Sequence, residues 1–316
     1  MRAVKAIPEI TDNELLVRVE ACGVCRTDLH VIDGELGTYR AGRVPGHQIV
    51  GTVVQTGRMV TRVRAGTRVG IAWLRSTCGT CRWCRQGREN LCPDSAFTGW
   101  DADGGFAEYT TVPEAYAYPL PTVTDVDAAA PLLCAGIIGF RALTRSALPP
   151  GGRLGLYGFG SSAHITAALA RANGAELFVM TRGEGNRALA RTMDCEFVGD
   201  ADASPPVRLD SAIVFAPAGE LVPAALQATT RGGTVVLAGI HMSQIPPMDY
   251  RTNLFYERDL KSVTSNTRSD GDTLLRLARR LDLTPSVTTY SFDHTADAVS
   301  DLRSGATSGS LVITGT

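Results

Sequence analysis

The sequence predicts an α/β protein that combines a β-rich part with a doubly wound parallel sheet. Short segments of strand character, separated by Gly and Pro, fill the chain as far as Pro121, which predicts a folded antiparallel sheet or partial barrel. A strand, a glycine turn, a helix and a second strand follow at 153–180, and further strands then alternate with helical segments. That alternation predicts a parallel sheet with helices on its faces.

Composition limits the classes of function. The chain has 316 residues, 44% hydrophobic and 20% charged, which is ordinary for a globular protein of about two domains. A formal net charge of −1 gives no attraction to nucleic acid or to a membrane. No apolar run could span a bilayer and no signal-peptide core follows the first residues, so we expect a cytoplasmic protein. In such a chain the eight cysteines indicate metal binding or catalysis rather than disulfides.

Three segments of the first part favour strands. They are ELLVRVE at 14–20, IVGTVVQTG at 49–57 and RAGTRVGIAW at 64–73. Each is rich in Val, Ile or Thr and is bounded by turn residues, as expected for short strands of one antiparallel sheet.

A stretch rich in metal-binding side chains, residues 21–51, begins directly after the first of these strands. Cys25 and His47 offer a thiolate and an imidazole, and Cys134 lies far along the chain, where folding could add a second thiolate. Two Cys and one His leave one position of a tetrahedral zinc ion open, which is the arrangement of a catalytic site. Cysteine is also a common small core residue, so these three residues alone leave that alternative open.

The next motif is a run of four cysteines within fifteen residues, spaced by two, two and seven residues. Its members are Cys78, Cys81, Cys84 and Cys92. Cys-x-x-Cys turns aim two sulfurs at one ion and the fourth sulfur closes the tetrahedron, which predicts a structural zinc without an open position. An iron–sulfur cluster is the competing interpretation, because short cysteine runs also hold such clusters.

The strand–turn–helix–strand unit predicts a dinucleotide-binding site. Its strands are Arg153–Tyr157 and Glu176–Met180, and its helix is Ala163–Asn173, closed by Gly174 as C-cap. The turn, Gly158-Phe-Gly160-Ser-Ser-Ala163, resembles GxGxxG with Ala at the last position. Its glycines allow a pyrophosphate to approach the backbone at the helix N-terminus.

The remaining predicted elements complete both parts. Helices are predicted at 125–147, at 269–281 and at 291–305, the last with Asp293 as N-cap and Gly305 as C-cap. Strands are predicted at 211–218 and 233–240, and the final segment LVIT is expected to rejoin the sheet of the first part.

In this order, the motifs GVCRTDLH, PGHQIVG, CGTCRWCRQGRENLC, LLCAG and GFGSSAH resemble those of the zinc-dependent medium-chain alcohol dehydrogenases, over nearly the whole chain. The resemblance implies a GroES-like catalytic domain from residues 1–135 and 265–316, with a Rossmann NAD(P)-binding domain from residues 136–264 inserted. It implies two zinc ions per chain. Cys25, His47 and Cys134 would hold the catalytic ion, and the four-cysteine run the structural one.

The resemblance also implies a mechanism. Zinc stabilises the alkoxide of a bound alcohol, which releases hydride to the oxidised nicotinamide, and aldehyde reduction is the reverse. Thr27 and His30 are similar to the family's proton relay, and Asp28 to the carboxylate that orients the ligand His47. Arg26 is similar to a cation that contacts the cofactor pyrophosphate.

The substrate pocket is expected to be apolar, with Trp73, Leu36 and Ile138 among its walls. The sequence departs from the family pattern at Gln48, where a Glu is usual beside the ligand histidine, and at Ile138, where a Thr is common. Ser310 stands where an Arg often meets the cofactor, and the N-terminus is short by a hairpin, which is expected to expose a sheet edge. None of these departures removes a zinc ligand or the relay.

Cofactor contacts are expected at the glycine turn and at the ends of the parallel strands. Besides Gly158 and Gly160, they are Ser161, Ser162, Ala216, Gly239 and Ile240. The second strand of the unit ends in Thr181 and Arg182, with Arg187 close behind, where an Asp or Glu would bind the ribose 2′-hydroxyl of NAD. Neutral and cationic groups favour NADP(H) over NAD(H), and the alternative is that both arginines are simply solvated.

The other cysteines and histidines fit structural roles. Cys22 and Cys195 are expected to fill the core. His164, near a helix start, and His294 are expected to be structural, and His241 to lie near the nicotinamide or in the core or rim.

Three functions fit these observations. The first is a zinc-dependent alcohol dehydrogenase or aldehyde reductase that acts on a small-molecule alcohol or aldehyde, as a homodimer or homotetramer. The second is a related biosynthetic reductase of iminium or enone substrates, for which Thr27→Ala would cost little turnover. The third is a non-catalytic dinucleotide-binding zinc protein, which a single active substrate would exclude.

Overall fold

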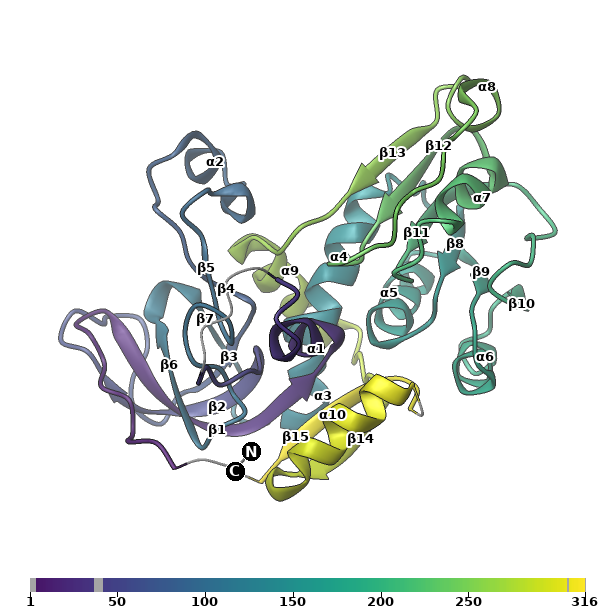
Figure 1. The fold of residues 1–316 in the computed structure, drawn as a ribbon. Coiled ribbons are helices and arrows are strands. Elements are labelled where there is room, and N and C mark those ends of the chain that lie inside the picture. Colours follow the sequence, from purple (N-terminus) through teal and green to yellow (C-terminus); the bar gives the residue numbers. More distant parts are fainter. Residues whose placement is uncertain (1–3, 37–41, 306, 316) are drawn as a thin grey trace.

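The computed structural model describes residues 4–36, 42–305 and 307–315 of the chain. Two large sheets and one two-stranded sheet organise these residues. The parallel sheet lies at the right of Figure 1, and the sheet that both ends of the chain build lies at the lower left. The α/β fold class predicted from the sequence is therefore confirmed.

The first sheet has seven strands and is mainly antiparallel. Its central strand β1 pairs with β2, β6 and the late strand β15. The strands are β1 Glu14–Val24, β2 Gln48–Thr56, β3 Arg68–Ile71, β6 Tyr109–Pro113, β7 Ala117–Pro119, β14 Val287–Ser291 and β15 Ser310–Thr314. The expected return of the last segment to this sheet is confirmed. Strand β1 is longer than predicted because its second half pairs with β15, from Ala21 opposite Thr314 to Val24 opposite Leu311.

The second sheet has six parallel strands in the order β10-β9-β8-β11-β12-β13. In chain order this is 3-2-1-4-5-6, the order of a doubly wound dinucleotide-binding sheet. The strands are β8 Arg153–Tyr157, β9 Glu176–Met180, β10 Phe197–Gly199, β11 Leu209–Val214, β12 Thr229–Leu237 and β13 Asp259–Ser262, and the helices α5 Ser161–Ala172, α6 Glu184–Arg191, α7 Leu221–Ala228 and α8 Tyr250–Asn253. Apolar side chains line both faces because helices cover the sheet.

The helix predicted at 125–147 is broken. The structure has α3 Val126–Ala129, the 3-10 turn η3 Ala130–Leu133 and α4 Ala135–Arg145, with a bend of 48°. Cys134 occupies the break with φ −136° and ψ −68°, outside the helical region. Among the described residues no single helix is long and apolar enough to cross a membrane. The bent pair formed by 126–133 and α4 reaches the required length and apolar composition only when its two parts are taken together. Much of the pair is buried in the core.

The remaining elements range from two residues in β5 to thirteen in α9. They are α1 Arg26–Ile32, β4 Leu74–Ser76, α2 Arg82–Arg85, η1 Glu89–Leu91, β5 Ala96–Phe97, η2 Glu114–Tyr116, α9 Arg268–Arg280, η4 Phe292–His294 and α10 Thr295–Ser304. Gly305 caps α10 at φ 70°, as predicted. The predicted N-cap Asp293 is wrong: it lies inside η4, so the N-cap of α10 is His294.

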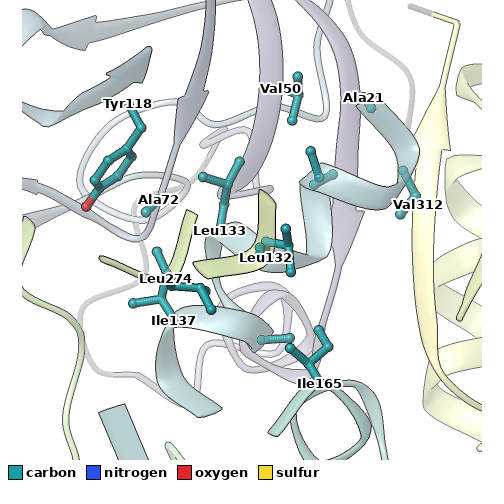
Figure 2. Close-up of a cluster of buried hydrophobic side chains, with 14 of the residues drawn as sticks. Ala21, Val50, Ala72, Tyr118, Leu132, Leu133, Ile137, Ile165, Leu274 and Val312 are labelled. Carbon is teal, nitrogen blue, oxygen red and sulfur yellow. The ribbon is translucent and has the colours of Figure 1, made fainter. Parts of the chain in front are cut away.

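One hydrophobic core joins the first sheet to the helices α4, α5 and α9. Figure 2 shows Ala21 and Val50 from the first sheet above Leu133, with Ile137 next to Leu274 of α9 and Ile165 from α5 below them. Leu133 and Ile137, which flank the break at Cys134, are 0% and 1% exposed. Truncation of such residues to Ala costs about 2–5 kcal/mol. The core therefore holds Cys134 in place from both sides.

Candidate active site

A cavity of about 620 Å³ receives residues from both large sheets. Cys25, Thr27 and His30 reach it from the end of β1 and from α1, and Cys134 reaches it from the start of α4. The glycine turn after β8 forms another wall. Folding has therefore brought Cys25, Thr27, His30 and Cys134 to the same space as the predicted dinucleotide turn.

The three residues predicted as catalytic zinc ligands lie together. Their ligand atoms, from Cys25, His47 and Cys134, are all within 4.8 Å of one another. His47 Nε2 is 3.4 Å from Cys25 Sγ, so the ring presents this nitrogen to the sulfurs. Two thiols and an imidazole converging on one point are a donor set that suits zinc.

Asp28 fixes this arrangement from behind. The carboxylate is 1% exposed, and it accepts the backbone N–H groups of Cys25 at 2.8 Å and of Gly46 at 3.1 Å. Its Oδ1 also lies 3.1 Å from His47 Nδ1, in charge contact although not in a well-aligned hydrogen bond. Asp28 thereby turns the other ring nitrogen, Nε2, toward the cysteines.

Gly46 makes this turn possible. Its φ is +94°, a conformation that favours glycine. A Cβ at this position would lie 2.6 Å from Phe106 and 2.9 Å from the Cys22 sulfur. No larger residue fits before His47.

The ionisable groups of this cluster shift one another's pKa values. Burial alone would lower the pKa of His47, but Asp28 and Cys25 outweigh it and raise that pKa to about 10. The hydrogen bond shared with Cys134 and burial raise the pKa of Cys25 well above its usual value. A bound cation would offset this cost of forming thiolates.

The predicted relay residues face the cavity. Thr27 and His30 are three residues apart on α1, on one helix face, and both line the space. The Nδ1 of His30 is in close contact with a carboxylate oxygen of Glu35, whose side chain is 51% exposed. The ring also packs against His241, with 5.5 Å between the ring centroids. Glu35 was not predicted, because the sequence alone does not show that the chain turns back after α1.

Gln48 occupies a different environment. It is 2% exposed at the start of β2, paired with Gly23, and is not among the cavity-lining residues. A Cβ at Gly23 would lie 2.9 Å from the Gln48 amide carbon, so the side chain packs over that glycine.

The four-cysteine run also converges. The sulfurs of Cys78, Cys81, Cys84 and Cys92 lie within 4.8 Å of one another. The backbone N–H of Cys81 donates to Cys78 Sγ at 3.3 Å. Backbone N–H groups of Thr80 and Cys81 lower the pKa of Cys78, as expected for a sulfur that is a thiolate when it binds a metal.

The glycine turn and the start of α5 face the same cavity. Gly158 has φ +89°, and a Cβ there would lie 2.9 Å from the backbone nitrogen of Ala216. Gly160 is the N-cap of α5 and offers no side-chain cap, so the first N–H groups of the helix remain available for an anion. The Ser161 hydroxyl is 2.6 Å from that of Ser310 on β15.

All the predicted cofactor contacts line the cavity except Arg187. Arg187 is paired with Glu184 and Asp200. Arg182, by contrast, is exposed at the cavity wall and has no ion pair within the described residues. The buried Thr181 hydroxyl accepts the Phe159 N–H at 3.1 Å and so supports the glycine turn. Only Arg182 of the two arginines is free to meet a phosphate.

Three aromatic side chains with nearly parallel rings form one wall of the cavity. Trp73 stacks on Phe97 at 5.0 Å and lies parallel to Trp100, with 6.2 Å between centroids and 6° between planes. The rings of Trp73 and His47 lie edge to face, with 4.8 Å between their centroids, so this wall begins at the candidate metal ligands. Trp73 was predicted from the sequence as part of the pocket wall, whereas Phe97 and Trp100 were not. The pairing of Leu74 with Phe97 in the β4–β5 sheet brings them together.

Five further residues were predicted to lie at the cavity or in the core. Ile138 and Leu36 line the cavity, as does His241. Cys22 is fully buried in the first sheet's core and Cys195 packs partly buried against the core of the second, as expected.

Comparisons place these features among known proteins. Residues 11–122 match the family model of the alcohol dehydrogenase GroES-like domain. A probable alcohol dehydrogenase, AdhA, of Mycobacterium tuberculosis is 51% identical over 99% of this chain and 92% of its own length. A cinnamyl alcohol dehydrogenase from Sorghum bicolor has a TM-score of 0.87 at 28% identity, over 97% of this chain and 91% of that one. A putative zinc-binding dehydrogenase from Sinorhizobium meliloti, bound to NADP, has a TM-score of 0.84 at 28% identity, over 98% and 94%.

Proposed function

Since the chain belongs to the zinc-dependent medium-chain alcohol dehydrogenase family, we propose that it interconverts aromatic alcohols and aldehydes with NADP(H) and a catalytic zinc ion. One observation carries the proposal. A single cavity is lined by Cys25 and Cys134, whose sulfurs lie within 4.8 Å of the His47 ring nitrogen, by the relay residues and by the glycine turn before α5. Hydride transfer needs these components in one place.

The ligand cluster fits zinc by the chemistry of its donors. Cys25, His47 and Cys134 would hold the ion, and Asp28 keeps the imidazole aimed at it. When bound, zinc supplies a Lewis acid for the substrate oxygen and the nicotinamide supplies the hydride donor or acceptor. Three protein donors leave room for the substrate oxygen as the fourth.

Thr27 and His30 move the proton. The Thr27 hydroxyl, at the cavity wall, accepts the proton of the substrate hydroxyl in the oxidation while its own proton passes on toward His30, and both transfers reverse in the reduction. His30 passes the proton toward solvent, and the carboxylate on its Nδ1 keeps Nε2 available on the cavity side. Glu35 is half exposed and so completes a path to water.

The aromatic wall supports the choice of substrate. A planar aryl ring bound beside the zinc ligands would stack on Trp73 and Trp100, each contact worth about 0.5–1.5 kcal/mol beyond its buried area. An aliphatic chain gains no such contribution. The neighbour named for cinnamyl alcohol agrees with this chemistry.

The cofactor end supports NADP(H). The free guanidinium of Arg182 at the cavity wall would bind a 2′-phosphate, and no carboxylate at the end of β9 opposes it. The NADP-bound neighbour is consistent with this choice.

The rest of the proposal concerns the whole protein. The cysteines of the run 78–92 would hold a structural zinc, for a total of two ions per chain. The catalytic domain would comprise residues 1–135 and 265–316, with the cofactor domain between them. We expect a cytoplasmic homodimer or homotetramer.

The test combines metal analysis with turnover on one sample. Two zinc ions per chain, and a kcat/KM with NADPH for benzaldehyde and cinnamaldehyde at least about tenfold above that for butanal and hexanal, would support the proposal. Turnover of aliphatic aldehydes alone would contradict the substrate class. Two zinc ions with dinucleotide binding, but no turnover of any alcohol or aldehyde, would contradict the enzyme.

A further inference from the structure

The lobe that carries the four-cysteine run contacts the chain segment that connects the parallel sheet to α9. This connection, residues 263–267, leaves β13 and runs beside the lobe, whose helix α2 projects at the upper left of Figure 1. The two segments are more than 170 residues apart in sequence. Thr264, Ser265 and Asn266 of the connection also line the catalytic cavity. The lobe therefore touches the back of a cavity wall.

Two residues of the lobe, Glu89 and Asn90, make the contact, and only Leu91 separates them from its last cysteine. Glu89 Oε1 accepts the backbone N–H of Arg268 at 3.1 Å and its Nε at 3.2 Å. Asn90 donates from Nδ2 to the carbonyl of Thr264 at 2.9 Å. Glu89 and Asn90 are 5% and 6% exposed, which is unusual for a carboxylate unless it is paired.

Glu89 is held as a carboxylate. Burial alone would raise its pKa, but the N–H groups around it and the Arg268 guanidinium outweigh burial and lower the pKa. The guanidinium also lies 5.0 Å above the ring of Tyr116, whose hydroxyl is 2.7 Å from Thr77, next to Cys78. The contact is thus anchored at both ends of the cysteine run.

The connection needs such support. Ser265 has φ +51°, an uncommon conformation for a residue with a Cβ, and such strain persists only where neighbouring structure imposes it. Downstream, Thr267 forms a capping box with Asp270, which pairs with Arg141 of α4 at 2.7 Å. Ser265 therefore lies between two fixed points of the chain. One is the hydrogen bond from Asn90 of the lobe to Thr264, and the other is the ion pair of Asp270 with Arg141 of α4.

We propose that Glu89 and Asn90 are positioning residues for the cofactor: through them the tetrathiolate lobe fixes the cavity wall at 264–266. The effect on cofactor affinity rests on the proposed function, whereas the effect on the wall itself does not. The lobe then has a second role besides stability. A lobe that loses its metal would loosen a wall of the distant cavity without changing Cys25, His47 or Cys134.

The test compares Glu89→Gln and Asn90→Ala with Glu114→Gln as a matched control. Glu114 is also a carboxylate that accepts backbone N–H groups, those of residues 61–63, away from the cavity. Hydrogen exchange of residues 263–268 is measured first on the purified, zinc-loaded protein before any nucleotide is added. NADPH affinity by fluorescence titration, zinc content and steady-state kinetics follow.

We expect exchange at 263–268 to rise at least fivefold in both lobe variants, with two zinc ions retained. The Kd and KM for NADPH should rise about fivefold to twentyfold while kcat changes less than twofold, and Glu114→Gln should leave all of these unchanged. Unchanged exchange at 263–268 in Asn90→Ala, the milder variant, would overturn the inference whatever the kinetics. If the wild-type chain bound no nucleotide, the proposed function would fail and exchange alone would decide the inference.

Discussion

The ring of His164 joins the two large sheets: its Nε2 accepts the backbone N–H of Ser286 at 3.2 Å, 122 residues further along the chain. His164 lies on α5, just after the glycine turn, and Ser286 lies directly before β14. The other ring nitrogen, Nδ1, is 3.2 Å from the carbonyl of Gly160. Only a neutral ring that carries its proton on Nδ1 satisfies both contacts.

This contact predicts a loss of stability in mild acid. Burial lowers the pKa of His164 below its usual value of 6.5. The backbone contacts at Gly160 and Ser161 act to raise this pKa, but burial outweighs them. The unfolded chain therefore takes up the proton first, so the stabilisation is complete above about pH 6.5 and falls as the pH decreases through the lower folded pKa. We expect His164→Gln to remove about 1 kcal/mol at pH 7.5 and to flatten the profile below pH 6.5. Urea unfolding from pH 5 to 8 measures both, and an equally steep profile in the variant would contradict the assignment.

The predictions that agree with the structure rest mostly on short-range patterns in the sequence. The spacing of the cysteine run and the glycine turn between two strands are short-range features, and the structure brings each group together as expected. The break at Cys134 was missed because the Ala and Leu residues that favour a helix were weighed above Pro131, which lies at the start of η3. Proline removes an i→i−4 hydrogen bond and clashes with the preceding turn, so this break was visible in the sequence.

Features that depend on distant pairing escaped prediction. The aromatic wall needs β4 and β5 to pair, and the support of the cavity wall joins Asn90 to Thr264, 174 residues apart. Arg187 was predicted to contact the cofactor from its position in sequence, but Asp200 on a neighbouring strand end pairs with it. A carboxylate that arrives from another segment cannot be read from the local motif.

The two metal clusters should respond differently to loss of one sulfur. Cys134→Ser should reduce the zinc content from two ions to one and lower kcat by at least about a hundredfold, with little effect on unfolding. Cys92→Ser should also cost one ion, but it should lower the melting temperature by several degrees, because an ion shared by the four sulfurs would hold the two ends of the run 78–92 together. Zinc analysis and thermal unfolding of both variants measure this. Equal losses of stability would contradict the separate roles.

The two arginines near the end of β9 should differ in their effect on cofactor choice. Arg182→Ala should raise the KM for NADPH about tenfold and leave the KM for NADH within about twofold, because its guanidinium is free to bind a 2′-phosphate. Arg187→Ala should change both by less than threefold, since Glu184 and Asp200 already pair with it. The ratio of kcat/KM for the two cofactors is the measurement. A larger effect at Arg187 would show that phosphate displaces those carboxylates.

The aromatic wall should control preference among aldehydes. Trp100→Ala should lower kcat/KM for cinnamaldehyde about fivefold to tenfold and leave that for butanal within twofold, because only a planar ring can stack on the indole. Trp100→Phe is the matched control and should retain most of the preference. Equal losses for both aldehydes would mean that Trp100 only shapes the cavity.

Proton transfer should depend on Thr27 and, more weakly, on Glu35. Thr27→Ala should lower kcat about a hundredfold, whereas Thr27→Ser, which keeps the hydroxyl, should stay within about fivefold of wild type. Glu35→Gln keeps a hydrogen-bonding group beside His30 Nδ1 but removes the charge, so kcat should fall by less than tenfold. Solvent isotope effects on kcat distinguish slower proton transfer from misfolding, because only the former raises them. If Thr27→Ala retained full turnover of an enone or iminium, the result would contradict the alkoxide mechanism and favour a direct reductase of those acceptors.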